Sequence, residues 1–71
     1  MTLKQYLELN KPNYINVLMA TNKIGKTISV MYTRKEYTDK DIMCNELLNC
    51  DVDEVRQEDG YIAIWVVKGG K

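Results

Sequence analysis

Carboxylates are the side chains most able to do chemistry in this sequence, and they are concentrated in one short stretch. That stretch contains Asp51, Asp53, Glu54, Glu58 and Asp59. A calcium loop needs oxygen ligands at fixed positions and a central glycine, but Val55 and Arg56 stand at a ligand position and at the glycine position. A strand would also send Asp53 and Glu54 to opposite faces, away from any shared ion. We interpret the stretch as a solvated edge strand whose charges discourage pairing with further strands.

The same carboxylates have a functional alternative. Asp53, Glu54, Glu58 and Asp59 would form an acidic strip along one hairpin. Such a strip could dock on a basic partner surface, as a phage-type inhibitor of a nucleic-acid-binding protein would do.

Phosphate chemistry is suggested by the string Ala20-Thr21-Asn22-Lys23-Ile24-Gly25-Lys26-Thr27. It approximates the phosphate-binding pattern G-x-x-x-x-G-K-[ST], with alanine in the first glycine position and with Lys23 and Lys26 as the phosphate contacts. The pattern needs a helix directly after its lysine, because the N–H groups of a helix N-terminus hold the phosphates. Residues 28–32 instead alternate and are rich in β-formers. We therefore expect a basic hairpin loop, with phosphate binding as the less favoured alternative.

Paired nucleophiles and bases are missing from the sequence, which contains no histidine. Histidine is the usual general base near neutral pH. The one serine, Ser29, falls in an expected strand with no evident base beside it. We expect no catalytic residue, no cofactor and no enzyme activity.

The two cysteines are Cys44 and Cys50. On one helix they would be separated by about 9 Å along the axis, beyond the roughly 7 Å that a disulfide spans between Cα atoms. Their spacing is not C-x-x-C, and no histidine could complete a metal site. We expect reduced cysteines that pack as small apolar side chains, and no metal site.

The first half of the chain is predicted to form a helix and a hairpin. Thr2, with Gln5 three residues later, predicts a capping box at the start of a short amphipathic helix. Pro12 ends that helix, because the residue before a proline disfavours the helical conformation. Alternating side chains then predict strands over residues 14–20 and 27–33.

The second half repeats this plan. Thr38 is the expected N-cap of a second helix, whose apolar stripe contains Ile42, Met43, Leu47 and Cys50. A charged strand over residues 51–57 and an apolar strand over residues 61–67 follow. Asp59-Gly60 between them is a strong hairpin signal.

This order predicts an α+β fold with the element order αββαββ. We expect a single four-stranded, mainly antiparallel sheet with two short helices, in one small domain over residues 1–71 whose residues 68–71 form a flexible tail. The charged strand 51–57 belongs at an edge and the apolar strand 61–67 in the interior. The expected spatial order is first, second, fourth and third strand, all antiparallel.

The strand over residues 61–67 is apolar at every position, so both of its faces avoid water. We expect the helices to cover one face of the sheet, which carries Ile15, Val17, Met19, Ile28, Val30, Tyr32, Ile62, Ile64 and Val66. The other face would then expose an apolar set. Trp, Tyr and Met are enriched at interfaces, and we predict partner contacts on that face. The predicted contact residues are Leu18, Met31, Tyr61, Trp65 and Val67. The alternative is that one helix crosses over to this face.

Composition narrows the classes of function. The net charge is zero and 45% of the residues are hydrophobic, which argues against a disordered chain and against nucleic acid as the main partner. No stretch approaches the roughly 20 apolar residues of a membrane span, so we expect no membrane association. Residues 1–6 lack the apolar core of a secretory signal, which predicts a cytoplasmic protein.

Together these patterns predict a small non-catalytic protein-interaction module that binds a protein partner or itself, as a homodimer. The alternatives are a nucleic-acid-associated regulator that uses the basic loop, and the acidic inhibitor described above. The abundance of Lys, Asn, Ile and Tyr is typical of AT-rich bacteria and of their phages and mobile elements.

Overall fold

A computed structural model describes residues 1–20, 27–39 and 41–68 of the chain. The elements in those residues are α1 (Leu3–Asn10), β1 (Tyr14–Ala20), β2 (Thr27–Thr33), α2 (Arg34–Tyr37), α3 (Asn45–Leu48), β3 (Asp51–Gln57) and β4 (Ile62–Val67). The α+β class and the single four-stranded sheet are confirmed. The bounds predicted for the first three strands coincide with those of β1, β2 and β3.

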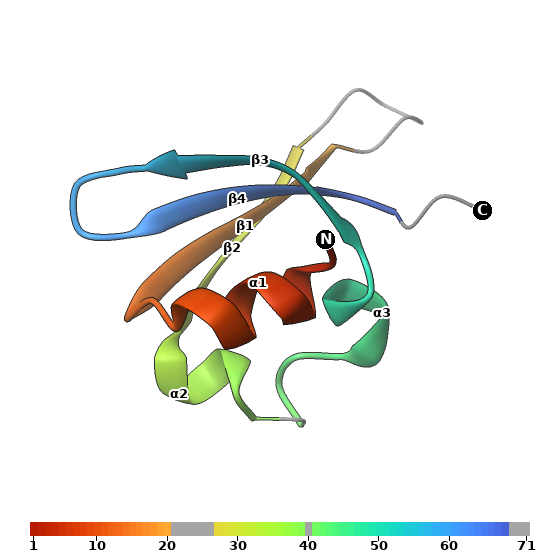
Figure 1. The fold of residues 1–71 in the computed structure, drawn as a ribbon, viewed down its shortest axis with the longest axis horizontal. Helices are drawn as coiled ribbons and strands as arrows, with labels where there is room; N and C mark the ends of the chain where they lie inside the picture. The colour runs from red at the N-terminus through yellow and green to blue at the C-terminus, as the bar shows by residue number, and fades with distance from the viewer. Residues whose placement is uncertain (21–26, 40, 69–71) are drawn as a thin grey trace.

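The sheet has the strand order β2-β1-β4-β3, and it is mixed (Figure 1). The outer pairs β1–β2 and β3–β4 are antiparallel, whereas the central strands β1 and β4 run parallel. The predicted edge position of the charged strand and the interior position of the apolar strand are confirmed. The predicted order of the first two strands, and a wholly antiparallel sheet, are wrong.

The side chains of the first hairpin explain this correction. Each strand runs in the same direction in the predicted sheet and in the observed sheet, but in the observed sheet β1 rather than β2 lies beside β4. In β1, Ile15 and Val17 are buried on one face and Leu18 is half-buried on the other. In β2, residues 27–31 are all exposed. A strand that is apolar on both faces is stabilised in the interior of a sheet, and a strand with one polar face tolerates the edge.

The start of α1 is confirmed as predicted. The Thr2 side chain accepts a hydrogen bond from the Gln5 backbone, and the Gln5 side chain accepts one from the Thr2 backbone. Lys11 ends the helix in the left-handed conformation, with a φ of 44°.

The second predicted helix is wrong in its start and in its continuity. Its capping box lies five residues earlier than expected, between Thr33 and Glu36, and α2 lasts a single turn. The Asp39 carboxylate then accepts a hydrogen bond from the backbone of Asp41. A side chain that bonds the local backbone in this way competes with helix formation. The described residues accordingly form three short helices where two were expected.

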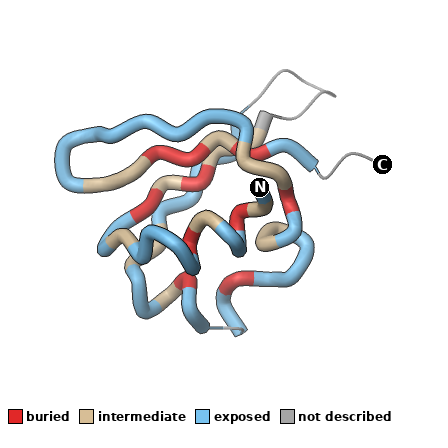
Figure 2. The backbone as a smooth tube through the Cα atoms, in the orientation of Figure 1, coloured by how far each residue is buried: buried red, intermediate tan, exposed pale blue. Residues whose placement is uncertain are grey.

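The core lies between the helices and one face of the sheet. Its buried members are Leu3, Leu7, Ile15, Val17, Tyr37, Met43, Cys50, Ile64 and Val66. All three helices lie on that one side of the sheet (Figure 1), and the buried residues gather between the two layers (Figure 2). The predicted core face is confirmed at Ile15, Val17, Ile64 and Val66, but not at Ile28 and Val30, which are exposed.

Candidate interaction surfaces

The face of the sheet opposite the helices has no helix over it in the described residues (Figure 1). Paired residues of neighbouring strands share a face, so register defines the rows that cross it. One row contains Ser29, Leu18, Trp65 and Glu54. The next row contains Met31, Asn16, Ala63 and Arg56. We call this surface the open face.

The residues predicted to bind a partner lie on or beside the open face. Leu18 and Trp65 are half-buried neighbours at its centre. Met31 and Val67 are more exposed, at 51% and 47% of their surface. Tyr61 is half-buried and lies just before β4, outside the strand. The structure thus brings four of these side chains onto one face and puts the fifth at its end.

Tyr14 is a further aromatic residue of the open face, with 52% of its surface exposed. It pairs with Thr33 of β2 at the end of the face nearest the helices. A polar contact lies beside it, where the Ser29 hydroxyl donates a hydrogen bond of 2.8 Å to the Asn16 side chain. The alternation of β1 contained the signal for Tyr14, since it shares a face with Asn16 and Leu18.

The predicted acidic strip, Asp53, Glu54, Glu58 and Asp59, is exposed throughout. Glu54 forms an ion pair with Arg56 on the same strand. A bulge interrupts β3 between Val52 and Glu54, so Asp53 has no partner of its own in β4. No group of acidic or thiol side chains that could hold a metal ion occurs in the described ranges. Glu54 lies at the β3 edge of the open face, and Glu58 and Asp59 follow directly after β3, so they form an acidic border on that side.

The phosphate-binding alternative depended on residues 20–27. Lys23 and Lys26 lie outside the described residues, as does the loop they belong to. Residues Thr27–Thr33 form β2 rather than the helix that a phosphate loop requires.

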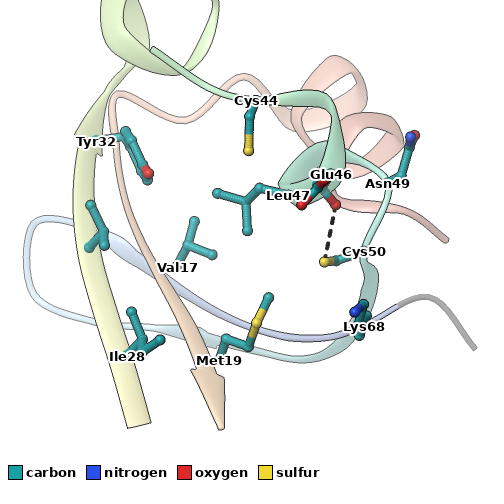
Figure 3. A pocket seen from close by; sticks show the side chains of 11 residues that line it. Val17, Met19, Ile28, Tyr32, Cys44, Glu46, Leu47, Asn49, Cys50 and Lys68 are labelled. Carbon is teal, nitrogen blue, oxygen red and sulfur yellow. Dashed lines mark hydrogen bonds between the residues drawn. The ribbon is translucent and has the colours of Figure 1, made fainter. Parts of the chain in front are cut away.

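A groove of about 820 Å³ lies on the helix side of the sheet, between β2 and α3 (Figure 3). Its floor is formed by the β1 and β2 side chains Val17, Met19, Ile28, Val30 and Tyr32. The α3 side contributes Leu47 and Cys50, and the Cys50 thiol donates a hydrogen bond to the Glu46 carbonyl. Burial raises the pKa of the Tyr32 hydroxyl, and the nearby charges of Cys44 and Glu36 raise it further.

Sequence reasoning did not find this groove. It placed Ile28, Val30 and Tyr32 under a helix, whereas Ile28 and Val30 are 52% and 41% exposed. The short α2 and α3 do not reach over them, and the length of those helices was predicted wrongly. The two cysteines differ: Cys50 is buried as expected, whereas Cys44 is an exposed thiol at the groove.

None of the helices in the described residues is long and apolar enough to cross a membrane. No family model matches the chain, and comparisons with curated proteins and with solved structures gave no match.

Proposed function

We propose that this protein is a small binding module without catalytic activity, and that it binds a partner protein through its open face. One observation carries the proposal: Trp65 and Leu18 are neighbours at the centre of a sheet face that no helix covers in the described residues. Tyr14, Met31 and Val67 surround them and are about half exposed. Monomers rarely expose large contiguous apolar patches, and buried aromatic residues dominate binding energy at interfaces.

The charges of the open face indicate the chemistry of the partner. The row that contains Trp65 continues to Glu54, and Val67 is opposite Asp51. The acidic border at Glu58 and Asp59 extends the same side. We expect a partner surface with an apolar centre and with basic side chains where it meets β3.

The same charges argue against nucleic acid as the partner. Affinity for nucleic acid depends on clustered Lys and Arg side chains. The strand residues of the open face include Asp51, Glu54 and Arg56, and Arg56 is already paired with Glu54. This balance of charge would repel a phosphate backbone more than it attracts one.

A matched pair of variants tests the proposal. Val67→Lys adds a charge to the open face, whereas Leu9→Lys adds the same charge at an exposed apolar residue of α1. We expect a partner recovered from extract of the producing cells to bind the wild type and Leu9→Lys, and to be lost with Val67→Lys. Because Trp65 is the only tryptophan, the purified partner should shift its emission to the blue. Trp65→Ala should weaken binding by about thirtyfold or more, as expected for a central aromatic residue.

Two results would contradict the proposal. One is a partner that binds Val67→Lys as tightly as the wild type and leaves Trp65 emission unchanged. The other is a salt-dependent change of Trp65 emission on adding single-stranded DNA or RNA, which would favour the nucleic-acid alternative.

The proposed site of action is the cytoplasm, which fractionation of the producing cells tests.

A further inference from the structure

The outer edge of β2 is a separate feature from the open face. Among the described residues, β2 pairs with β1 on one side and with no strand on the other. Alternate N–H and C=O groups of an edge strand point outward without a strand partner, which makes such an edge a template for further pairing. Natural sheets usually block this template with charge, a bulge or a covering segment.

The opposite edge, β3, has all three kinds of protection. Its start is covered, because the Leu3 backbone donates a 2.8 Å hydrogen bond to the Cys50 carbonyl and Val52 donates one to the Met1 carbonyl. Its middle contains the bulge at Asp53. Its second half presents the charged pair of Glu54 and Arg56 to solvent.

In the part of the chain that the structure describes, none of these protections applies to β2. Its sequence, Thr-Ile-Ser-Val-Met-Tyr-Thr, contains no charged residue and no proline. Its register with β1 runs without a break from Ala20–Thr27 to Tyr14–Thr33. Its first five residues are exposed, so the edge is long, regular and uncharged.

The helix side of this edge is also apolar and uncovered. Ile28, Val30 and Tyr32 line the groove on that side, and Figure 3 shows Ile28 and Tyr32 among its lining side chains. Ile28 and Val30 leave about half of their surface in water. A strand added beside β2 would therefore gain both backbone hydrogen bonds and apolar contacts.

We propose that β2 pairs antiparallel with β2 of a second copy of this chain, about a two-fold axis at Val30. In this register Val30 is opposite its own copy and Ile28 is opposite Tyr32 of the second copy. On the open-face side Ser29 is opposite Met31, and the threonines at the two ends of the strand are opposite each other. The sheets of the two copies join into one continuous sheet.

A second copy fits this edge because the strand is self-complementary. Antiparallel partners share a face, so each groove-lining residue of one copy meets a groove-lining residue of the other. Ile28, Val30 and Tyr32 of both copies form a single apolar row, which extends each groove across the axis. The lack of charge on β2 lets two identical strands approach without like-charge repulsion. Isologous contacts of this kind are the usual basis of two-fold dimers.

Sedimentation velocity over a range of concentrations tests the dimer. Val30→Lys sets two like charges against each other on the axis, and we expect it to weaken self-association by about tenfold or more. Val55→Lys is the matched control, because Val55 is a similarly exposed valine on the helix side of the other edge strand. Urea unfolding of both variants checks that they fold.

A disulfide test fixes the register without a destabilising charge. Directly opposed positions of antiparallel strands have Cα atoms about 4.5–5.5 Å apart, which is within disulfide range. In a Cys44→Ser background, Val30→Cys should therefore form a covalent dimer on mild oxidation, whereas Val55→Cys in the same background should not.

Three outcomes would overturn the proposal. They are a wild type that stays monomeric up to about 1 mM, a dimer that Val55→Lys disrupts and Val30→Lys does not, and a Val30→Cys variant that does not cross-link. If β2 pairs with a strand from another protein while the pure chain stays monomeric, the proposed dimer of this chain is likewise overturned. Val67→Lys, which blocks the open face, should leave the dimer intact, so the two proposals fail independently.

Discussion

The two hairpins of this sheet share a plan but are held in place differently. In each hairpin one strand lies at the centre of the sheet and the other at an edge. The β3–β4 hairpin is paired with the N-terminal segment at Asp51 and Val52. The β1–β2 hairpin leads into the helices at Thr33, whose side chain caps α2. One edge of the sheet is therefore covered by the N-terminal segment, whereas the other edge, β2, has no strand beside it in the described residues.

Besides the burial of Ile15 and Val17 under the helices, polar contacts hold one end of the first hairpin. The Arg34 backbone donates a 2.9 Å hydrogen bond to the Asn13 carbonyl, and the Arg34 side chain donates one to the Lys11 carbonyl. The buried Tyr37 hydroxyl donates to the Pro12 carbonyl. These contacts fix the end of β2 that leads into α2 and leave the exposed residues 27–31 without support from a helix.

The largest expected effect on stability distinguishes the central strand β4 from the edge strand β3 of the second hairpin. Ile64 is fully buried and pairs with Val55 of the edge strand. Ile64→Ala should lower the free energy of unfolding by about 2–5 kcal/mol because it leaves a cavity. Val55→Ala should lower it by about 0.5 kcal/mol, as is usual for an exposed site. Urea unfolding followed by circular dichroism measures both.

If Ile64→Ala does not fold, Ile64→Val should lower the free energy of unfolding by about 0.5–1.5 kcal/mol. Equal losses for substitutions at Ile64 and Val55 would contradict the distinction between the central and the edge strand.

The turn of the second hairpin should give the next largest effect. Gly60 has a φ of 91°, which other L-residues rarely adopt, and open space surrounds the position of a Cβ atom there. Gly60→Ala should cost about 1–3 kcal/mol through backbone strain alone. Asp59→Ala, at the neighbouring exposed position, should change stability little. A neutral Gly60→Ala would mean that the turn relaxes and contributes little to the hairpin.

The anchor of the first hairpin should give a smaller effect. Thr33→Ala removes the side-chain cap of α2 and should cost about 1 kcal/mol in thermal or urea unfolding. Thr38→Ala is the control, because Thr38 lies at the end of α2 rather than at its start. Its hydroxyl donates hydrogen bonds to the carbonyls of Arg34 and Lys35. A larger loss of stability from Thr38→Ala than from Thr33→Ala would contradict the N-cap at Thr33 and favour the helix start at Thr38 that the sequence predicted.

The smallest expected effect concerns Tyr32, at the better-buried end of β2. Burial and nearby negative charge raise the pKa of Tyr32 above 10.0, so the folded protein holds the phenolic proton more tightly than the unfolded chain does. This contribution to stability is complete below about pH 10 and is lost as the pH rises through the folded pKa. Tyr32→Phe should therefore lose less stability than the wild type between neutral and alkaline pH. An identical decline in both proteins would contradict this.

Sequence reasoning predicted the strands well because alternation and turn signals are local. It also predicted that Ile62, Ile64 and Val66 face the helices and that β3 is an edge strand. It failed where a decision depended on comparing distant segments. Nothing within β1 or β2 alone says which of them lies beside β4, although the apolar residues on both faces of β1 carried that information.

The second helix was predicted wrongly for a different reason. Thr33 and Thr38 both offer plausible caps, and the competing hydrogen bond from Asp39 to Asp41 depends on the backbone around it. The error hid the groove, because one continuous helix would have covered Ile28 and Val30. The surplus of apolar residues, a property of composition rather than of any one contact, left two alternatives for the open face. No helix covers it in the described residues, and its contact with a partner stays a prediction.

The parallel pair at the centre of the sheet has a consequence for synthesis and folding. Ile15 pairs with Ile62 and Met19 with Val66, so the innermost contacts join segments far apart in the chain. Contacts of high sequence separation slow folding, since a long stretch of chain must be ordered before they form. A nascent chain that has produced both hairpin strands of its first half still shows β1 with a bare inner edge. Until β4 emerges and pairs with it, that inner edge exposes backbone groups that another chain could pair with.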